Sequence, residues 1–113
     1  MEGAGGASII DLRARSGKRQ SVFRSYVFPY MDRSNLTVIT HALVTRITLE
    51  GKRATGVEID YGGSIHRIRA GLEVVLSLGA IQTPKVLMQS GIGDQAELRR
   101  FGIPVVQHLP GVG

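Results

Sequence analysis

The 113-residue chain contains no cysteine and no tryptophan, and only 5% of its residues are aromatic. The absence of cysteine excludes disulfides, thiolate metal sites and a cysteine nucleophile. The small number of aromatic side chains argues against a stacking platform for nucleic acid bases. No apolar run approaches the roughly eighteen residues that suggest a membrane-spanning helix, so no membrane span is expected.

The chain is basic, with a net charge of +5 from 14 basic and 9 acidic residues. Its basic residues are scattered, with several near the start, two at Arg67 and Arg69, and two at Arg99 and Arg100. This distribution favours a solvated surface, and a nucleic-acid-binding domain is the disfavoured alternative. The opening residues lack the basic and apolar regions of a secretory signal, so a cytoplasmic location is the default expectation.

Motifs that would carry chemistry by themselves are missing from the sequence. His41, His66 and His108 have no further histidine or carboxylate at a metal-ligand spacing, so no metal site is predicted and each is interpreted as a structural or surface residue. No glycine pattern of a nucleophile elbow surrounds Ser77 or Ser90. The Gly-x-Gly-x-x-Gly fingerprint of dinucleotide-binding folds is also absent. No catalytic residue is therefore assigned.

The composition and length suit one small domain. The helices and strands predicted below make its fold class α/β, with α+β character in isolation. Residues 1–7 are glycine-rich and are interpreted as a flexible or truncated end, followed by a domain over residues 8–113. A turn is predicted at residues 16–17. A short helix is predicted within residues 21–32, where apolar residues recur at helical spacing until Pro29 interrupts them.

From Asn35 the apolar spacing changes to that of strands. Four strands are predicted, at residues 36–41, 44–49, 54–61 and 64–69. Gly62 and Gly63 favour a hairpin turn between the last two, and Glu58 and Asp60 are expected to share a solvent-facing strand face. The continuous apolar run at 73–78 predicts a central strand covered on both faces, at the end of this β-meander.

A turn of small residues, Gly79 and Ala80, follows this apolar run. Thr83 is expected to cap the next helix, with Pro84 in the first helical position and residues 85–89 supplying the turns. Small residues let a ligand approach the backbone, and a helix start favours an anion such as the diphosphate of a dinucleotide. The alternative is a small-residue turn that only allows close packing of the strand against the helix.

A second helix is predicted near the end of the chain. Gly91 can end the first helix in a left-handed conformation. The run from Asp94 to Glu97 resembles a capping box, which predicts a helix as far as about Phe101 that Gly102 ends. Residues 103–106 are expected to be extended, and residues 109–113 are expected to form a loop.

Five segments, in order along the chain, resemble signature segments of the glucose-methanol-choline (GMC) family of flavin oxidoreductases, with a choline dehydrogenase-like pattern. They are Lys18–Tyr26, Asn35–Ile47, Gly51–Glu58, Gly79–Gly93 and Leu98–Gly113. The resemblance implies a slice of an FAD-binding domain, in an enzyme that oxidises a small alcohol by hydride transfer to FAD. It also implies that the backbone of Val44 contacts the adenine end of FAD and that Gly79 and Ala80 lie against the cofactor.

The family's amino-terminal Gly-x-Gly-x-x-Gly unit and its carboxy-terminal substrate domain, with the catalytic histidine, are not in this sequence. The partners implied are therefore the missing domains of a parent chain and a small alcohol. The isolated chain is expected to bind FAD poorly, to catalyse nothing, and to be at risk of aggregation through residues 74–78. The alternatives are a non-catalytic remnant or a small interaction module that offers an exposed sheet edge to a partner chain.

Overall fold

The computed structural model describes residues 13–113, which fall into two compact units that divide after Ile39. The prediction for residues 1–7 lies outside the described residues. In the first unit, β1 (Ala14–Arg15) and β2 (Lys18–Arg19) form a small antiparallel hairpin. The turn between them at residues 16–17 was predicted from the sequence.

The expected short helix of the first unit is also present. It consists of a π-helical turn, η1 (Phe23–Val27), and a 3₁₀ turn, η2 (Phe28–Tyr30). Pro29 occupies an early position of η2, where its missing N–H costs no helical hydrogen bond. The proline thus coincides with the change from one helical form to the other.

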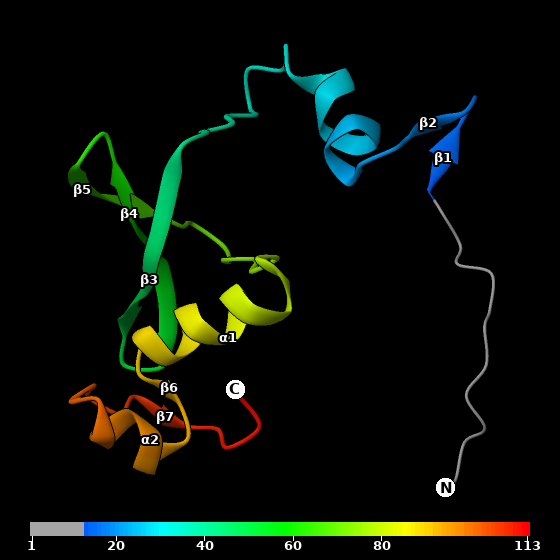
Figure 1. Ribbon diagram of the computed structural model, residues 1–113. Coiled ribbons are helices and arrows are strands. Elements are labelled where there is room, and N and C mark those ends of the chain that lie inside the picture. Colours follow the sequence, from blue (N-terminus) through cyan, green and yellow to red (C-terminus); the bar gives the residue numbers. More distant parts are fainter. Residues whose placement is uncertain (1–12) are drawn as a thin grey trace, which may run out of the picture. The chain divides into compact units, whose positions relative to one another are not determined.

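The second unit is built on an antiparallel meander of three strands, in the order β3-β4-β5 (Figure 1). These strands are β3 (Ala42–Glu50), β4 (Arg53–Tyr61) and β5 (Ser64–Arg69). Gly62 and Gly63 have φ angles of 61° and 77°, which a two-residue hairpin turn of the type I′ form requires. The three strands and this turn confirm the prediction from alternating apolar residues.

The strand predicted at residues 36–41 is wrong, because β3 begins only at Ala42. Ala42 pairs with Tyr61, which is the last residue of β4. Residues 36–41 therefore have no strand opposite them, and a β-rich composition alone cannot form a ladder.

The central strand predicted at residues 73–78 is also wrong in this structure, where that segment has no regular secondary structure. A strand is defined by a hydrogen-bonded neighbour, and none of the strands in residues 13–113 pairs with this run. The segment leads instead directly into helix α1.

Helix α1 (Gly79–Gln89) begins earlier than predicted, so the proposed cap at Thr83 is wrong. Thr83 lies within the helix, and its hydroxyl accepts a hydrogen bond from the backbone N–H of Leu78 at 3.1 Å. Pro84 also lies inside the helix. The N–H that Pro84 lacks would have bonded the carbonyl of Ala80, so the proline disturbs only the first turn.

The second predicted helix is confirmed as α2 (Gln95–Arg100). The Asp94 carboxylate caps it by accepting hydrogen bonds from the N–H groups of Ala96 and Glu97, at 2.8 and 3.1 Å. Two short strands, β6 (Ile92–Gly93) and β7 (Gln107–His108), pair in parallel on either side of α2 in the sequence. This mixture of helices with an antiparallel meander agrees with the expected fold class.

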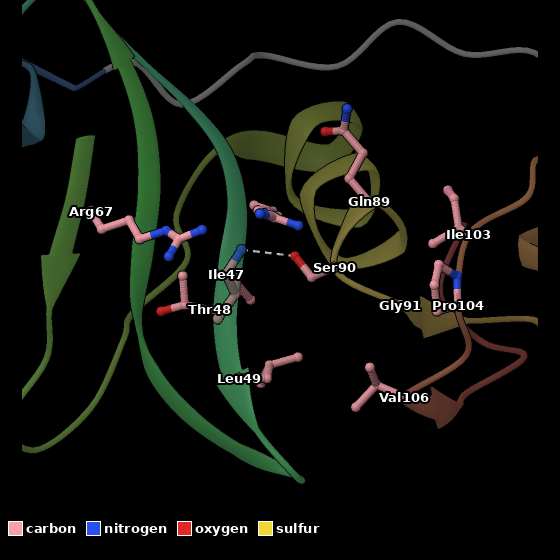
Figure 2. Close-up of a pocket in the computed structure, with 11 residues that line it drawn as sticks. Ile47, Thr48, Leu49, Arg67, Gln89, Ser90, Gly91, Ile103, Pro104 and Val106 are labelled. Atoms are coloured by element: carbon pink, nitrogen blue, oxygen red, sulfur yellow. Dashed lines mark hydrogen bonds between the residues drawn. The ribbon is translucent and has the colours of Figure 1, made fainter. Parts of the chain in front are cut away.

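The core of the second unit lies between the meander and α1. Ile47, Ile59 and Val86 are buried there, and Leu98 of α2 is fully buried. The Ser90 hydroxyl accepts a hydrogen bond from the N–H of Ile47 at 2.8 Å (Figure 2). It also donates one to the carbonyl of Val86. This buried serine therefore ties the end of α1 to β3.

Candidate functional site

The position of Val44 depends on an irregularity in the pairing of β3 with β4. Val44 lies opposite Ile59, but Arg46 lies opposite Glu58, so Thr45 is an extra residue that forms a β-bulge. Because of this bulge, Val44 and Ile47 lie on the same face of the sheet although they are three residues apart. The bulge thus turns Val44 towards the apolar face.

Val44 lines an apolar hollow of about 320 Å³ in the second unit. Aliphatic side chains from β4, β5 and the segment before α1 line it as well: Val57, Ile68, Val74, Val75, Leu76 and Leu78. Leu78 immediately precedes Gly79, so the hollow extends from Val44 to the start of the small-residue turn. Gly79 and Ala80 themselves do not line it.

Gly79 and Ala80 are exposed at the start of α1. Gly79 has a φ angle of 87°, in the region that favours glycine. Apart from its chain neighbours and the backbone of α1, no atom lies within 4 Å of where its Cβ would be. The backbone of this turn is therefore open to a ligand. The packing alternative, in which glycine is needed for close strand–helix contact, finds no support at Gly79.

Glu58 occupies an environment that the sequence interpretation missed. Glu58 is only 9% exposed, so the prediction that it faces solvent is wrong. Asp60, on the same face of the strand, is half-buried. Arg46 donates two hydrogen bonds to the Glu58 carboxylate, at 3.1 and 2.9 Å, and Arg67 lies 3.5 Å away. Glu58 is thus the centre of a cross-strand ion cluster.

This cluster changes the ionisation of its members. The hydrogen bond from Arg46 is the main cause that holds the pKa of Glu58 below its usual value, and burial opposes it. The same contact raises the pKa of the Arg46 guanidinium. The Glu58 side chain is therefore a charged hydrogen-bond acceptor for its neighbours at neutral pH.

One part of this cluster carried a signal in the sequence. The turn at Gly62 and Gly63 fixes a register in which Glu58 faces Arg67, so opposite charges across the hairpin could have indicated the pair. The pairing of Arg46 with Glu58 depends on the bulge at Thr45, which no local pattern of residues indicates. Sequence reasoning therefore could have found half of the cluster.

A second hollow, of about 370 Å³, lies beside the buried serine (Figure 2). Ser90, Gln89 and Arg67 border it, together with Ile103 and Pro104. The Ser90 hydroxyl is already engaged with the backbone of β3 and α1. This arrangement supports packing of the chain rather than nucleophilic chemistry.

Two of the three histidines, His66 and His108, have structural neighbours. His108 Nδ1 accepts a hydrogen bond from the N–H of Gln95 at 3.2 Å, and the ring of His66 lies 6.2 Å from that of Tyr61. Over residues 13–113, no three histidine, cysteine or acidic side chains are grouped as a metal site would require. Within the same residues, no helix has the length and apolar character needed to cross a bilayer.

The sequence model of the GMC oxidoreductase family matches residues 2–113. The chain is 48% identical to human mitochondrial choline dehydrogenase over 104 residues, and 50% identical to an oxygen-dependent choline dehydrogenase of Staphylococcus aureus over 103 residues. These matches cover 92% and 91% of the chain. The chain belongs to the GMC oxidoreductase family.

The solved structures give the same answer for the fold. An FAD-dependent oxidoreductase from Chaetomium thermophilum superposes with a TM-score of 0.78 at 36% identity, over 84% of this chain and 17% of that protein. The present chain likewise spans only 18% of the length of each of the two choline dehydrogenases. The architecture described above thus corresponds to a limited part of these longer proteins.

Proposed function

We propose that this chain forms part of the FAD-binding region of an enzyme that oxidises the CH–OH group of a small alcohol. The match of the GMC family model over residues 2–113 carries this proposal. When bound, FAD would supply the hydride acceptor for the alcohol carbon. Two of the relatives are named as choline dehydrogenases, which makes a choline-like alcohol the first substrate to test.

Three residues of the described structure fit contact with the cofactor. Val44 borders the apolar hollow, and its backbone adjoins the bulge that orients it. Gly79 and Ala80 present open backbone at the start of α1, where a flat or anionic group of the cofactor could approach closely. In this proposal Val44 contacts the adenine end, and the small-residue turn lies against the cofactor.

The chain supplies no assigned catalytic residue in this proposal. Hydride transfer requires that the substrate be held against the reactive part of the flavin, with a group that takes up the hydroxyl proton. None of Val44, Gly79 and Ala80 carries such a group. We therefore propose that the 113 residues alone bind FAD weakly and turn over no alcohol.

The first test is to determine the coding DNA on both sides of Met1 and Gly113, and to express the complete reading frame beside the 113-residue chain. The product of the complete frame is expected to retain yellow flavin through gel filtration and to reduce a dye when choline is added. A complete product without flavin would overturn the cofactor assignment. Flavin retained by the 113-residue chain itself would overturn only the proposal that it binds FAD weakly.

A second candidate function is an interaction module, which the outer edge of β5 favours. All six residues of β5 are exposed, and within residues 13–113 no strand pairs with its outer edge. Such an edge can accept a strand from another chain. If the reading frame is closed tightly around these residues, we expect this edge to capture an extended peptide, which amide exchange of β5 would detect.

A further inference from the structure

We infer that Thr45, held by Glu58, is a positioning residue that sets the backbone of Val44 for the cofactor. This inference rests on the proposed function, because it assumes that Val44 meets FAD. Thr45 is the extra residue of the bulge, directly after Val44. Its hydroxyl is 3.1 Å from the carbonyl oxygen of Glu58 and 3.2 Å from the Glu58 Oε1 atom.

The bulge matters because β3 without it would pair with β4 in a different register. In a regular strand Val44 and Arg46 would lie on the same face, since side chains alternate with a period of two. A pairing shifted by one residue would turn Val44 away from the apolar hollow. It would also reverse the direction in which the Val44 N–H and carbonyl point.

The Thr45 hydroxyl opposes such a shift by bonding across the strand pair at the bulge itself. Its acceptors are two oxygens of one residue, and the carboxylate is fixed in turn by two hydrogen bonds from Arg46. Thr45, the extra residue of the bulge, and Arg46, the next paired residue, are thus joined through Glu58. This connection ties the bulge to one place, next to Val44.

The same strand pair contains an internal comparison. A second register shift occurs between Thr48 and Leu49, and there the Thr55 hydroxyl lies 3.2 Å from the carbonyl oxygen of Thr48. Each irregularity is therefore held by one threonine hydroxyl on a backbone carbonyl of the opposite strand. Only the first adjoins Val44, so the two threonines separate a general effect on the sheet from an effect on the cofactor site.

The test compares Thr45→Val with Thr55→Val in the polypeptide that retains flavin in the reading-frame experiment. Each variant keeps the shape of the side chain and removes one hydroxyl. Thr45→Val is expected to raise the Kd for FAD about tenfold, as the loss of one well-placed hydrogen bond would. Thr55→Val is expected to change this Kd less than about twofold, and Thr45→Ser, which keeps the hydroxyl, should restore the wild-type affinity.

Amide hydrogen exchange on the same proteins provides a second measurement. In Thr45→Val the amides of residues 44–47 should exchange faster, with little change in β5. Equal effects of Thr45→Val and Thr55→Val on FAD affinity and on these amides would overturn the inference. If Thr45→Val fails to fold, Thr45→Ala removes the hydroxyl without the second methyl group and is judged by the same two readouts.

Failure of the proposed function and failure of this inference give different results. If the wild-type protein retains no FAD, the proposed function fails, and the cofactor role of Thr45 fails with it. If the wild type binds FAD but Thr45→Val binds it equally well, the proposed function stands and Thr45 is not a positioning residue.

Discussion

The meander and the apolar segment that follows it (residues 71–78) are neighbouring regions of the second unit. They differ in whether their backbone N–H and carbonyl groups form the hydrogen bonds of a sheet. The three strands β3, β4 and β5 pair with one another through short turns. Residues 71–78 contain as strong an apolar run but form no ladder. Leu72 is 96% exposed and Val75 is 74% exposed. Apolar content alone therefore does not produce a strand.

The difference lies in where each region finds its partner. A tight turn brings the partner of each meander strand within a few residues, so the cost of closing the loop is small. An all-apolar strand is typically covered on both faces and paired on both edges by segments distant in the sequence. The meander is thus specified locally, whereas residues 71–78 depend on elements that the described residues do not provide.

The largest expected effect comes from breaking the close pairing of the meander with Gly56→Ala. A Cβ atom on Gly56 would lie 2.1 Å from the carbonyl oxygen of Ile68, a backbone atom that cannot rotate away. The strand pair must separate, so we expect a loss of about 3 kcal/mol in the free energy of unfolding, at the upper end of the usual effect of overpacking. Urea denaturation followed by circular dichroism measures this loss.

Gly71→Ala is the matched control, because a Cβ on Gly71 would meet no atom within 4 Å. We expect a change within about 0.5 kcal/mol, as for other exposed positions. Equal effects of the two substitutions would contradict the contrast between a tightly paired meander and an open segment.

The sequence predicts correctly those turns, strands and helix caps that depend on a few adjacent residues. The turn at Gly62 and Gly63, the alternation in β4 and the cap at Asp94 each follow from a few adjacent residues, and each is present. In the candidate site, the positive φ angle of Gly79 at the start of α1 agrees with the local signal of a glycine, whereas its contact with the cofactor stays a prediction.

What the sequence did not predict depends on pairing between distant residues. The parallel pair of β6 with β7 joins segments on either side of α2, and the burial of Glu58 requires the bulge at Thr45. The predicted start of α1 is too late because proline favours the first helical position, whereas this helix contains Pro84 in its interior. Whether Val44 meets the cofactor stays a prediction.

A smaller effect is expected from pH, through the ion cluster of the meander. The pKa of Glu58 is lowered in the folded state. Its charge therefore stabilises the fold at pH values above the unfolded pKa of about 4.3. This stabilisation is lost as the pH falls through the lower, folded-state pKa. Glu58→Gln should therefore be less stable than wild type at pH 7, with a difference that shrinks as the pH is lowered through that range. Thermal melts between pH 7 and pH 2 measure it.

Asp60→Asn is the control for this titration, because Asp60 lies on the same strand without the contacts of Glu58 to Arg46 and Arg67. Thermal melts of Asp60→Asn over the same pH range show how the loss of a carboxylate outside the cluster affects stability. A difference for Glu58→Gln that is constant with pH would show that the cluster contributes through packing rather than through charge.

The smallest expected effect on stability, but the clearest on association, comes from the open segment. Leu72→Ser combined with Val75→Thr should change the free energy of unfolding by no more than about 0.5 kcal/mol, because both side chains are already exposed. The same change should reduce concentration-dependent self-association of the 113-residue chain in sedimentation velocity, since it removes apolar surface that lacks a cover.

Leu43→Ser is the matched control, on a leucine of the meander that is 63% exposed. Isolated exposed leucines are common on protein surfaces, so Leu43→Ser should leave association nearly unchanged, and an equal reduction would show that the open segment is not the source of association.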